Sequence, residues 1–377
     1  MKKIFLFAVI SFASLYLFAQ QNSAVELDNF DPIDFVRFEK ELGKETAGTA
    51  ADKIAGAETD KTAGAETAGI VADKIASDKT VADKTADAEN AKNNLLEYTI
   101  GEGAQNFTSK RAISSFEINR YETVYKLWFE VREWAETQGY FFENKGREGS
   151  QGKPGKNPSV QNQWMPVTDI NWYDAIVWCN AFSQMCGLEP CYKYQNQILK
   201  DATNTAACDL VKCDFSASGF RLPTESEWEY AARKTLSGMQ QGVLASGQVD
   251  SKGFDNTEIP VGEIAWFYEN TDGTRRVGTA GTPFDPSSPP KPGSGNPNGS
   301  GLFDMSGNVL EWVFDWYADY SDSEDKNYCG PEFGSERVMR GGGWNIYTLF
   351  LGAGDRYSFN PAEKFNYFGF RIARNAF

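Results

Sequence analysis

Residues 337–374 decide the fold of this chain, and they read RVMRGGGWNIYTLFLGAGDRYSFNPAEKFNYFGFRIAR. The apolar residues 338–339 predict a short strand that leads into glycines at 341–343, where the missing Cβ lets backbone or a ligand approach closely. Residues 345–368 show neither helical nor strand periodicity, although they are rich in aromatic side chains. Residues 369–374 alternate as a closing strand. The sequence therefore predicts a glycine-rich turn, a long aromatic loop and a return strand.

The aromatic content of this loop gives the first functional hypothesis. Loops normally lie in water and are polar, so a long aromatic loop either packs over a core or contacts a ligand. Aromatic side chains give a large contact area at low conformational cost, which suits a binding surface. The candidate ligand-binding residues are Trp344, Ile346, Tyr347, Phe350, Tyr357, Phe359, Phe365 and Tyr367. The alternative, that these side chains only fill the space between loop and core, stays open.

Three further motifs precede this stretch. They are PV at 166–167 with INWYDA at 170–175, GFRLPTESEWEYAAR at 219–233, and GLFDMSGNVLEW at 301–312. Together with RVMRGGGW and GFRIAR they resemble, in the same order, the formylglycine-generating enzyme or sulfatase-modifying factor family. The resemblance covers residues 113–374. It implies an α+β domain, a variant of the C-type lectin fold, with few helices around short mixed or antiparallel sheets and much irregular loop.

The composition excludes several kinds of chemistry. The net charge is -15 and no Lys/Arg cluster occurs, which argues against nucleic acid and anionic membranes as ligands. The chain has no histidine, so histidine-assisted nucleophiles, histidine bases and histidine-ligated metals are excluded. The iron-dependent relatives of this family rely on histidine ligands, so no iron is expected.

The resemblance also implies where a copper site would lie. The family's enzymes use two cysteine thiolates in the loop after the glycine turn, and alignment places Ile346 and Leu351 there. Neither side chain can ligate copper or exchange disulfides. Gly343 replaces the motif's usual serine and Leu310 its usual tryptophan. We therefore expect that the protein binds no copper and has no catalytic residue. It is then a non-catalytic member of the family that binds a protein or a cell-surface glycan. A formylglycine-generating oxidase acting on sulfatases and a structural envelope protein are the alternatives.

Some exported members of this fold are variable proteins of diversity-generating retroelements, whose C-terminal loop is rewritten at adenines in asparagine codons. Every residue from 345 to 360 belongs to the set that such rewriting can produce, whereas Glu363 and Lys364 do not. Because the set is wide, the amino-acid sequence is compatible with a variable protein without requiring one.

A cation site is expected beside the strand that follows residue 308. Asp304, the carbonyl groups of the turn and Glu311 are hard oxygen ligands, which suit calcium better than a transition metal. The resemblance implies a structural calcium held by Asp304, Gly307, Val309 and Glu311, the outer two through side chains and the inner two through carbonyl groups. A hydrogen-bonded turn without metal is the alternative.

The N-terminus has the parts of a secretory signal peptide at residues 1–19, with two lysines before an apolar run at 4–18. The run is too short to favour a membrane-spanning helix, so no membrane insertion is expected after cleavage. The first cysteine is Cys179, which excludes a lipoprotein anchor at the cleavage site. The protein is therefore expected to be exported to the periplasm, the medium or the cell surface.

The remaining domain boundaries follow from composition. Residues 20–45 form a short N-terminal segment in which Phe35, Phe38 and Leu42 have helical spacing over residues 34–42. Residues 46–92 repeat ADKIA and AGAET with almost no large apolar residues, which indicates a low-complexity Ala/Lys/Asp/Thr stalk that acts as a spacer. The globular domain is expected at 95–377.

Periodicity and capping residues predict the main elements of that domain. We expect strands at 113–119 and 309–316, the second one central, and helices at 122–137, from Asn171 onward and from Thr224 to Arg233. The three glutamates at 225, 227 and 229 are interpreted as carboxylates favoured by a helix N-terminus rather than as acid catalysts.

Six cysteines in an exported chain are expected to be partly disulfide-bonded. Cys179 lies on the apolar face of an expected helix and is interpreted as a buried free thiol. Cys186, Cys191, Cys208 and Cys213 flank one loop, which one or two disulfide bonds would crosslink. Cys329 is distant from them in the sequence. Zinc binding by these thiols is a minor alternative, because their spacing is wider than in zinc ribbons.

Overall fold

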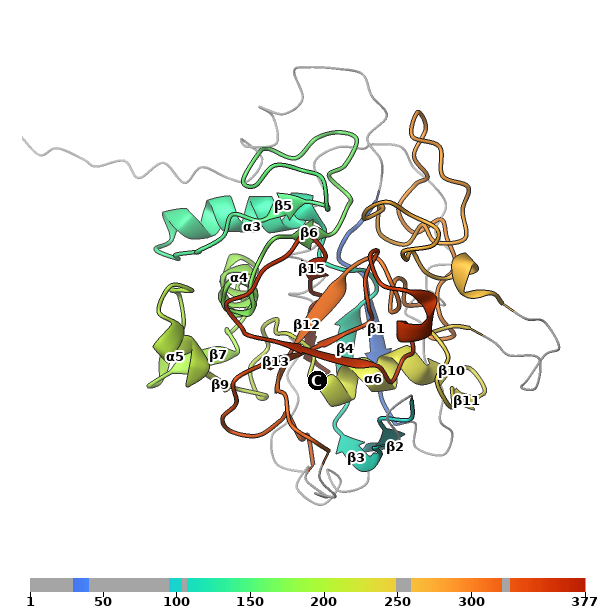
Figure 1. The fold of residues 1–377 in the computed structure, drawn as a ribbon. Coiled ribbons are helices and arrows are strands. Elements are labelled where there is room, and N and C mark those ends of the chain that lie inside the picture. Colours follow the sequence, from blue (N-terminus) through green and yellow to red (C-terminus); the bar gives the residue numbers. More distant parts are fainter. Residues whose placement is uncertain (1–29, 41–94, 104–106, 249–258, 321–325, 377) are drawn as a thin grey trace, which may run out of the picture.

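The computed structural model describes residues 30–40, 95–103, 107–248, 259–320 and 326–376 (Figure 1). The expected signal peptide at 1–19 and the repeat at 46–92 lie outside the described residues. Among the described residues there are four α-helices, several small sheets and much irregular loop, which confirms the α+β class. No helix in these ranges is long and apolar enough to cross a membrane.

The N-terminal segment forms a strand, so the helix expected at 34–42 is wrong over its described part. β1 (Phe35–Phe38) pairs antiparallel with β4 (Phe116–Asn119), which in turn pairs with β16 (Ala373–Asn375). Val36 and Phe38 are buried, a spacing of two that belongs to a strand. Pairing with a distant strand outweighs the helical spacing of the two phenylalanines.

The strand expected at 113–119 is divided between two sheets. β3 (Ser109–Ile113) pairs with β2 (Leu96–Ile100), whereas β4 pairs with β1. The chain therefore changes sheet at residues 114–115, next to Asn327, whose side-chain oxygen accepts a hydrogen bond from the Ser114 N–H at 2.6 Å.

Two of the expected helices begin at the predicted caps. α4 (Trp172–Met185) opens with a capping box of Asn171 and Asp174, and α6 (Glu225–Arg233) opens with one of Thr224 and Glu227. α5 (Thr205–Asp209) is a short additional helix.

The helix expected at 122–137 starts three residues late, as α3 (Tyr125–Thr137). Its would-be first residue, Glu122, instead turns inward and accepts hydrogen bonds from the backbone of Val309 at 3.1 Å and the Asn308 side chain at 2.6 Å. α3 lies beside α4 (Figure 1). The two helices pack through Trp128 and Trp178, whose rings stack with centroids 5.8 Å apart.

A mixed four-stranded sheet crosses the middle of the molecule in the order β14-β13-β12-β15 (Figure 1). β12 (Leu310–Trp316) is buried on both faces, which confirms the central strand. β13 (Arg337–Arg340) and β14 (Arg356–Phe359) pair antiparallel, and β15 (Phe368–Gly369) pairs parallel with β12.

Two details of the C-terminal stretch differ from expectation. Residues 356–359 form β14 inside the stretch expected to be irregular, because the backbone of β13 offers them a partner. The closing strand expected at 369–374 is divided into β15 and β16. Phe370, Arg371 and Ile372 between them are all buried, so the alternation in the sequence reflects no exposed face.

Short strand pairs and two 3-10 helices complete the description. These are β5 (Arg147–Glu148), β6 (Val167–Thr168), β7 (Tyr192–Tyr194), β8 (Gln197–Ile198), β9 (Lys212–Cys213), β10 (Lys234–Thr235), β11 (Gly238–Met239), η3 (Val261–Glu263) and η4 (Thr348–Phe350). The largest apolar cluster lies between α3, α4 and the mixed sheet, and a second one lies under α6.

Candidate ligand-binding surface

The C-terminal loop is closed at its base by Arg340. The Arg340 guanidinium donates hydrogen bonds to the carbonyl groups of Ala353, Gly354 and Asp355 at 3.0, 3.1 and 2.7 Å. It also forms an ion pair with Glu229 of α6, and neither side chain is exposed. The residues from 341 to 352 therefore form a lobe whose two ends are held together by one buried arginine.

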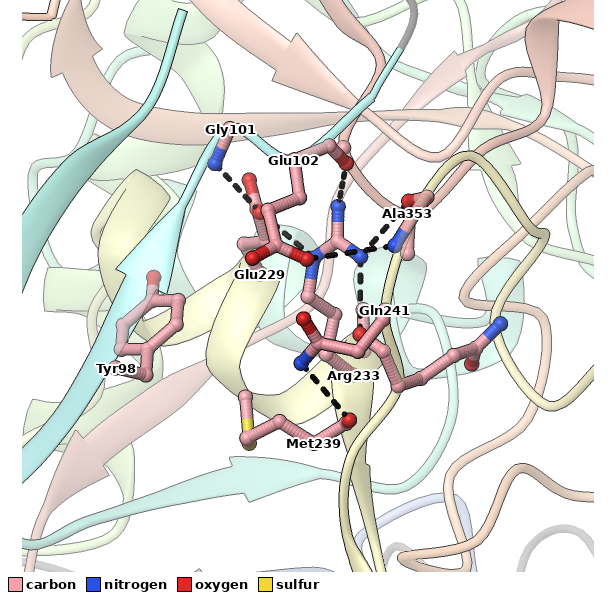
Figure 2. Close-up of polar contacts among 12 residues, drawn as sticks. Tyr98, Gly101, Glu102, Glu229, Arg233, Met239, Gln241 and Ala353 are labelled. Carbon is pink, nitrogen blue, oxygen red and sulfur yellow. Dashed lines mark hydrogen bonds and ion pairs between the residues drawn. The ribbon is translucent and has the colours of Figure 1, made fainter. Parts of the chain in front are cut away.

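A second arginine fixes Glu229 from the other side (Figure 2). Arg233 Nε lies 2.8 Å from a Glu229 oxygen, and the Gly101 N–H donates to the same oxygen at 2.8 Å. The Arg233 guanidinium also donates to the carbonyl groups of Gln240 and Gly242 at 3.1 Å. The base of the lobe is thus tied to α6 and to two other segments of the chain.

The other two glutamates of α6 also form ion pairs with arginine side chains. Arg356 reaches Glu225 with two hydrogen bonds, of 2.6 and 2.8 Å, and Arg221 reaches Glu227 with bonds of 2.6 and 2.7 Å. Burial raises the pKa of Glu225, but the Arg356 and Arg340 guanidinium groups outweigh it and lower that pKa overall. These carboxylates are ion-pair partners, which agrees with the interpretation that they are not acid catalysts.

The glycines of the turn are required by backbone geometry. Gly341 and Gly342 have φ angles of 93° and 71°, in the left-handed region that side chains rarely adopt. A Cβ on Gly342 would lie 2.6 Å from a methyl carbon of Leu351. The turn therefore brings the start of the lobe directly against its end.

Positions 346 and 351 contribute to an apolar cluster. Leu351 is fully buried in the cluster of Ala245, Ile264, Ala265 and Phe267, and Ile346 packs against it. Where the resemblance places two metal-binding thiols, this chain has two aliphatic side chains in apolar contact. The Ile346 and Leu351 side chains therefore contribute apolar packing.

The tip of the lobe exposes large apolar side chains. Tyr347, Leu349 and Phe350, in and beside η4, have 53%, 80% and 51% of their area exposed. Tyr268, which is 53% exposed, lies beside them with its ring centroid 4.5 Å from that of Tyr347. We call these four residues, three of which are aromatic, the aromatic surface.

Tyr268 was missed by sequence reasoning. Its N–H donates to the Ile346 carbonyl at 3.0 Å, and the next residue, Glu269, accepts a hydrogen bond from the Thr348 N–H at 3.3 Å. The run WFYEN at 266–270 was the available signal, because it places three aromatic residues in a row within an irregular region. Its distance along the chain hid its proximity to the lobe.

The other predicted ligand-binding residues are less exposed. Trp344 is half-buried and donates from Nε1 to the Asn366 carbonyl at 3.3 Å. The hydroxyl of half-buried Tyr357 donates to the Phe350 carbonyl at 2.6 Å, and burial raises the Tyr357 pKa. Phe359, Phe365 and Tyr367 form an aromatic cluster around buried Phe368, and of these Phe365 is the most exposed, at 41%. The predicted set therefore separates into an exposed tip and a base that packs on the core.

The predicted calcium residues lie in one buried region, but their side chains have different partners. Both carboxylate oxygens of Glu311 accept from Arg371, the shortest bond being 2.6 Å, and one also accepts from Trp228 Nε1 at 2.7 Å. These bonds occupy the Glu311 carboxylate, so a calcium ion there would compete with Arg371 and Trp228 for its oxygens.

Asp304 fits a cation better. One of its oxygens accepts from the Gly278 N–H at 2.5 Å, whereas the other is buried without a hydrogen-bond partner. Burial raises the Asp304 pKa to about 6. Glu122 is a further buried carboxylate that sequence reasoning missed, and its pKa is raised first by burial and then by the charges of Asp304 and Glu311. Calcium binding by Asp304, Gly307, Val309 and Glu311 stays a prediction.

The zinc alternative finds no support in the described part of the chain. Within those ranges no three Cys, Asp or Glu side chains come together in a way that would hold a metal ion.

The fold and its motifs define the class of the protein. The family model of the sulfatase-modifying factor enzyme 1-like domain matches residues 85–376. The chain belongs to this family, as its motifs predicted.

Individual relatives extend this result. The chain is 31% identical over 240 residues to the chaperone protein LppX of Paenibacillus barcinonensis, covering 62% of this chain and 70% of that protein. It is 33% identical over 175 residues to the formylglycine-generating enzyme of Streptomyces coelicolor, covering 42% of this chain and 48% of that protein. Because the chain spans about half of that enzyme, the match does not carry over its activity.

Among solved structures, Treponema denticola variable protein 1 is similar to this chain with a TM-score of 0.54 and 27% sequence identity. The superposition covers 75% of this chain and 96% of that protein. The two therefore share the fold along nearly the whole length of the solved protein.

Proposed function

We propose that this chain is a non-catalytic member of its family that binds a protein or a cell-surface glycan through the aromatic surface. One observation carries the proposal: Tyr347, Leu349 and Phe350 are exposed together at the tip of a lobe whose base is clamped by buried ion pairs. Large apolar side chains gathered at one exposed site are typical of a contact surface.

The clamp supports binding for an energetic reason. Association costs free energy for each loop and side chain that it orders, so a surface held in place before binding loses less. Arg340 and the Gly341–Gly342 turn restrict the lobe in the unbound protein. The tip of the lobe is therefore preorganised, while its side chains stay free to contact a partner.

The likeness to a solved variable protein supports a further part of the proposal, that the lobe is the region in which related proteins vary. Export, expected from residues 1–19, would place such a surface outside the cytoplasm. A formylglycine-generating oxidase remains the alternative function, and a structural envelope protein is the other; neither explains exposed aromatic side chains at the tip.

Site-specific photo-crosslinking in producing cells tests the proposal. A photoreactive phenylalanine analogue replaces Phe350, and a matched protein carries it at Leu236, which is 84% exposed in the turn between β10 and β11 and is not part of the aromatic surface. We expect a discrete crosslinked adduct from position 350 that is absent from position 236 and is lost when Tyr347→Ala is added. Equal adducts at both positions, or none at either, would contradict binding of a protein partner; the same variants applied to immobilised glycans test the second ligand class.

A further inference from the structure

Two thiols from different segments meet at the edge of the three-stranded sheet β8-β7-β9. Cys191 immediately precedes β7, and Cys213 ends β9. The strands pair antiparallel with Tyr192 opposite Cys213, and the Asp214 N–H donates to the Cys191 carbonyl at 2.8 Å. Backbone hydrogen bonds therefore hold the two chain segments next to each other at the positions of the two cysteines.

The side chains are in direct contact as well. The Cys213 thiol donates a hydrogen bond to the sulfur of Cys191, and the Cys191 thiol donates in turn to the Gly219 carbonyl oxygen at 3.3 Å. That hydrogen bond, opposed by burial and helped by the Arg221 guanidinium, lowers the pKa of Cys191 overall. Burial raises the pKa of Cys213. Both cysteines are free thiols in the structure, and their side chains are direct neighbours.

We propose that Cys191 and Cys213 are a disulfide site, oxidised by a small-molecule or protein disulfide. The thiolate of one cysteine attacks the oxidant, forms a mixed disulfide and releases one thiolate. The second cysteine loses its proton and attacks the mixed disulfide, which releases the other. In total, two protein thiols and one oxidant disulfide give one protein disulfide and two small thiols, so atoms and electrons balance.

The remaining cysteines have other surroundings. Cys179 is fully buried within α4, and the Cys208 sulfur contacts the Asp201 carbonyl at 3.5 Å. Burial raises the pKa of both thiols. Cys329 lies near enough to Cys213, and Cys179 near enough to Cys191, for their charges to interact, so these two thiols are the competing partners.

The bond would close the segment 191–213, which contains the β7–β8 hairpin and α5. This segment covers the mixed sheet, since the Tyr192 and Phe314 rings stack with centroids 5.6 Å apart. A crosslink here restricts the unfolded chain and should raise the melting temperature by about 5 °C, given the loop length and domain size.

The test uses the purified full chain in its reduced and oxidised forms. After equilibration with oxidised and reduced glutathione, titratable thiols in denaturant should fall from six to four, and a peptide map should join residues 191 and 213. The Cys208→Ser control should lose one thiol before oxidation and still lose two more on oxidation.

Two results would overturn the proposal. One is six thiols after equilibration; the other is a map that joins Cys213 to Cys329, or Cys191 to Cys179. The measurement on the unmutated chain decides both, so it does not depend on whether a Cys213→Ser variant folds. The proposal also stands apart from ligand binding at the lobe, because neither thiol belongs to the aromatic surface.

Discussion

Arg340 and Glu229 form a fully buried ion pair that joins β13 to α6. The same guanidinium holds the three carbonyl groups of residues 353–355, where the chain returns from the lobe. The position of an exposed surface is thereby set by a charge pair that has no contact with solvent.

Arg340→Met should destabilise the protein strongly, because it leaves Glu229 buried with only Arg233 beside it. Removal of one member of a buried pair typically costs about 3–5 kcal/mol. Urea unfolding measures the loss, and Lys126→Met, at an exposed ion pair with Glu130, is the control with an expected change of about 1 kcal/mol or less. A change at Arg340 as small as that of the control would show that the clamp does not hold the fold.

Alanine substitutions separate the tip of the lobe from its base. Leu351→Ala should cost about 2–5 kcal/mol because Leu351 is fully buried, whereas Tyr347→Ala and Phe350→Ala should cost about 1 kcal/mol or less. Tyr357→Ala should fall between them, since Tyr357 is half-buried. Unfolding curves give all four values. Losses above about 3 kcal/mol at Tyr347 and Phe350 would make the tip part of the core and remove the basis for ligand binding.

Stability should depend on pH through Asp315. Burial, and then the Glu225 carboxylate, raise the Asp315 pKa to about 8, whereas an aspartate in an unfolded chain titrates near 3.9. The folded state therefore binds this proton more tightly, and its contribution is lost as pH rises from about 4 to 8. Asp315→Asn cannot ionise and still accepts from the Glu225 N–H, which lies 2.7 Å from Asp315 Oδ2.

The expected result is that Asp315→Asn gains stability relative to the unmutated chain as pH rises, by on the order of a few kcal/mol at pH 8. Thermal or urea unfolding from pH 5 to 8 measures the difference. Glu363→Gln, which removes an exposed carboxylate, is the control. Parallel stability profiles for Asp315→Asn and the unmutated chain would contradict this assignment.

If calcium binds at the 304–311 turn, it stabilises the native state alone. A chelator should then lower the melting temperature by about 4 °C relative to calcium at about 100 times Kd. Asp304→Asn should abolish the response, whereas Glu311→Gln is a poor test because it also breaks the pair with Arg371. Magnesium at the same concentration is the ion control. An unchanged melt with and without chelator would leave the turn as a hydrogen-bonded structure.

Formylglycine-type oxidation is not expected from this chain. The purified protein is incubated with copper and a peptide carrying a sulfatase motif, and aldehyde formation is measured by mass spectrometry. An active formylglycine-generating enzyme under the same conditions is the control. Aldehyde above the metal-free level would show that Ile346 and Leu351 do not prevent the reaction.

Local signals were sufficient for the starts of α4 and α6 but not for that of α3. The boxes of Asn171 with Asp174 and Thr224 with Glu227 were read correctly because a cap depends on residues three positions apart. β12 was also predicted, since its aromatic side chains alternate over seven residues. The motifs that identified the family lie at these same places.

Long-range contacts explain the failures. β1 and β14 are strands because distant strands pair with them, and Tyr268 joins the lobe through a hydrogen bond from a separate segment. The buried arginines were similarly hidden, because the composition shows an acidic chain without showing which charges meet inside it. The exposed tip was only partly predictable, since Tyr347 and the more buried Tyr357 are equivalent in sequence terms.

The position of β1 shows how the two ends of the segment that contains the repeat at 46–92 are attached. β1 and β2 flank the repeat, and both belong to the folded domain, so both ends of the intervening segment are attached to the same body. A change in the number of repeat units therefore changes the length of chain between two strands of one domain. Because closure entropy rises only slowly with length, doubling that length should change the free energy of unfolding by about 0.6 kcal/mol.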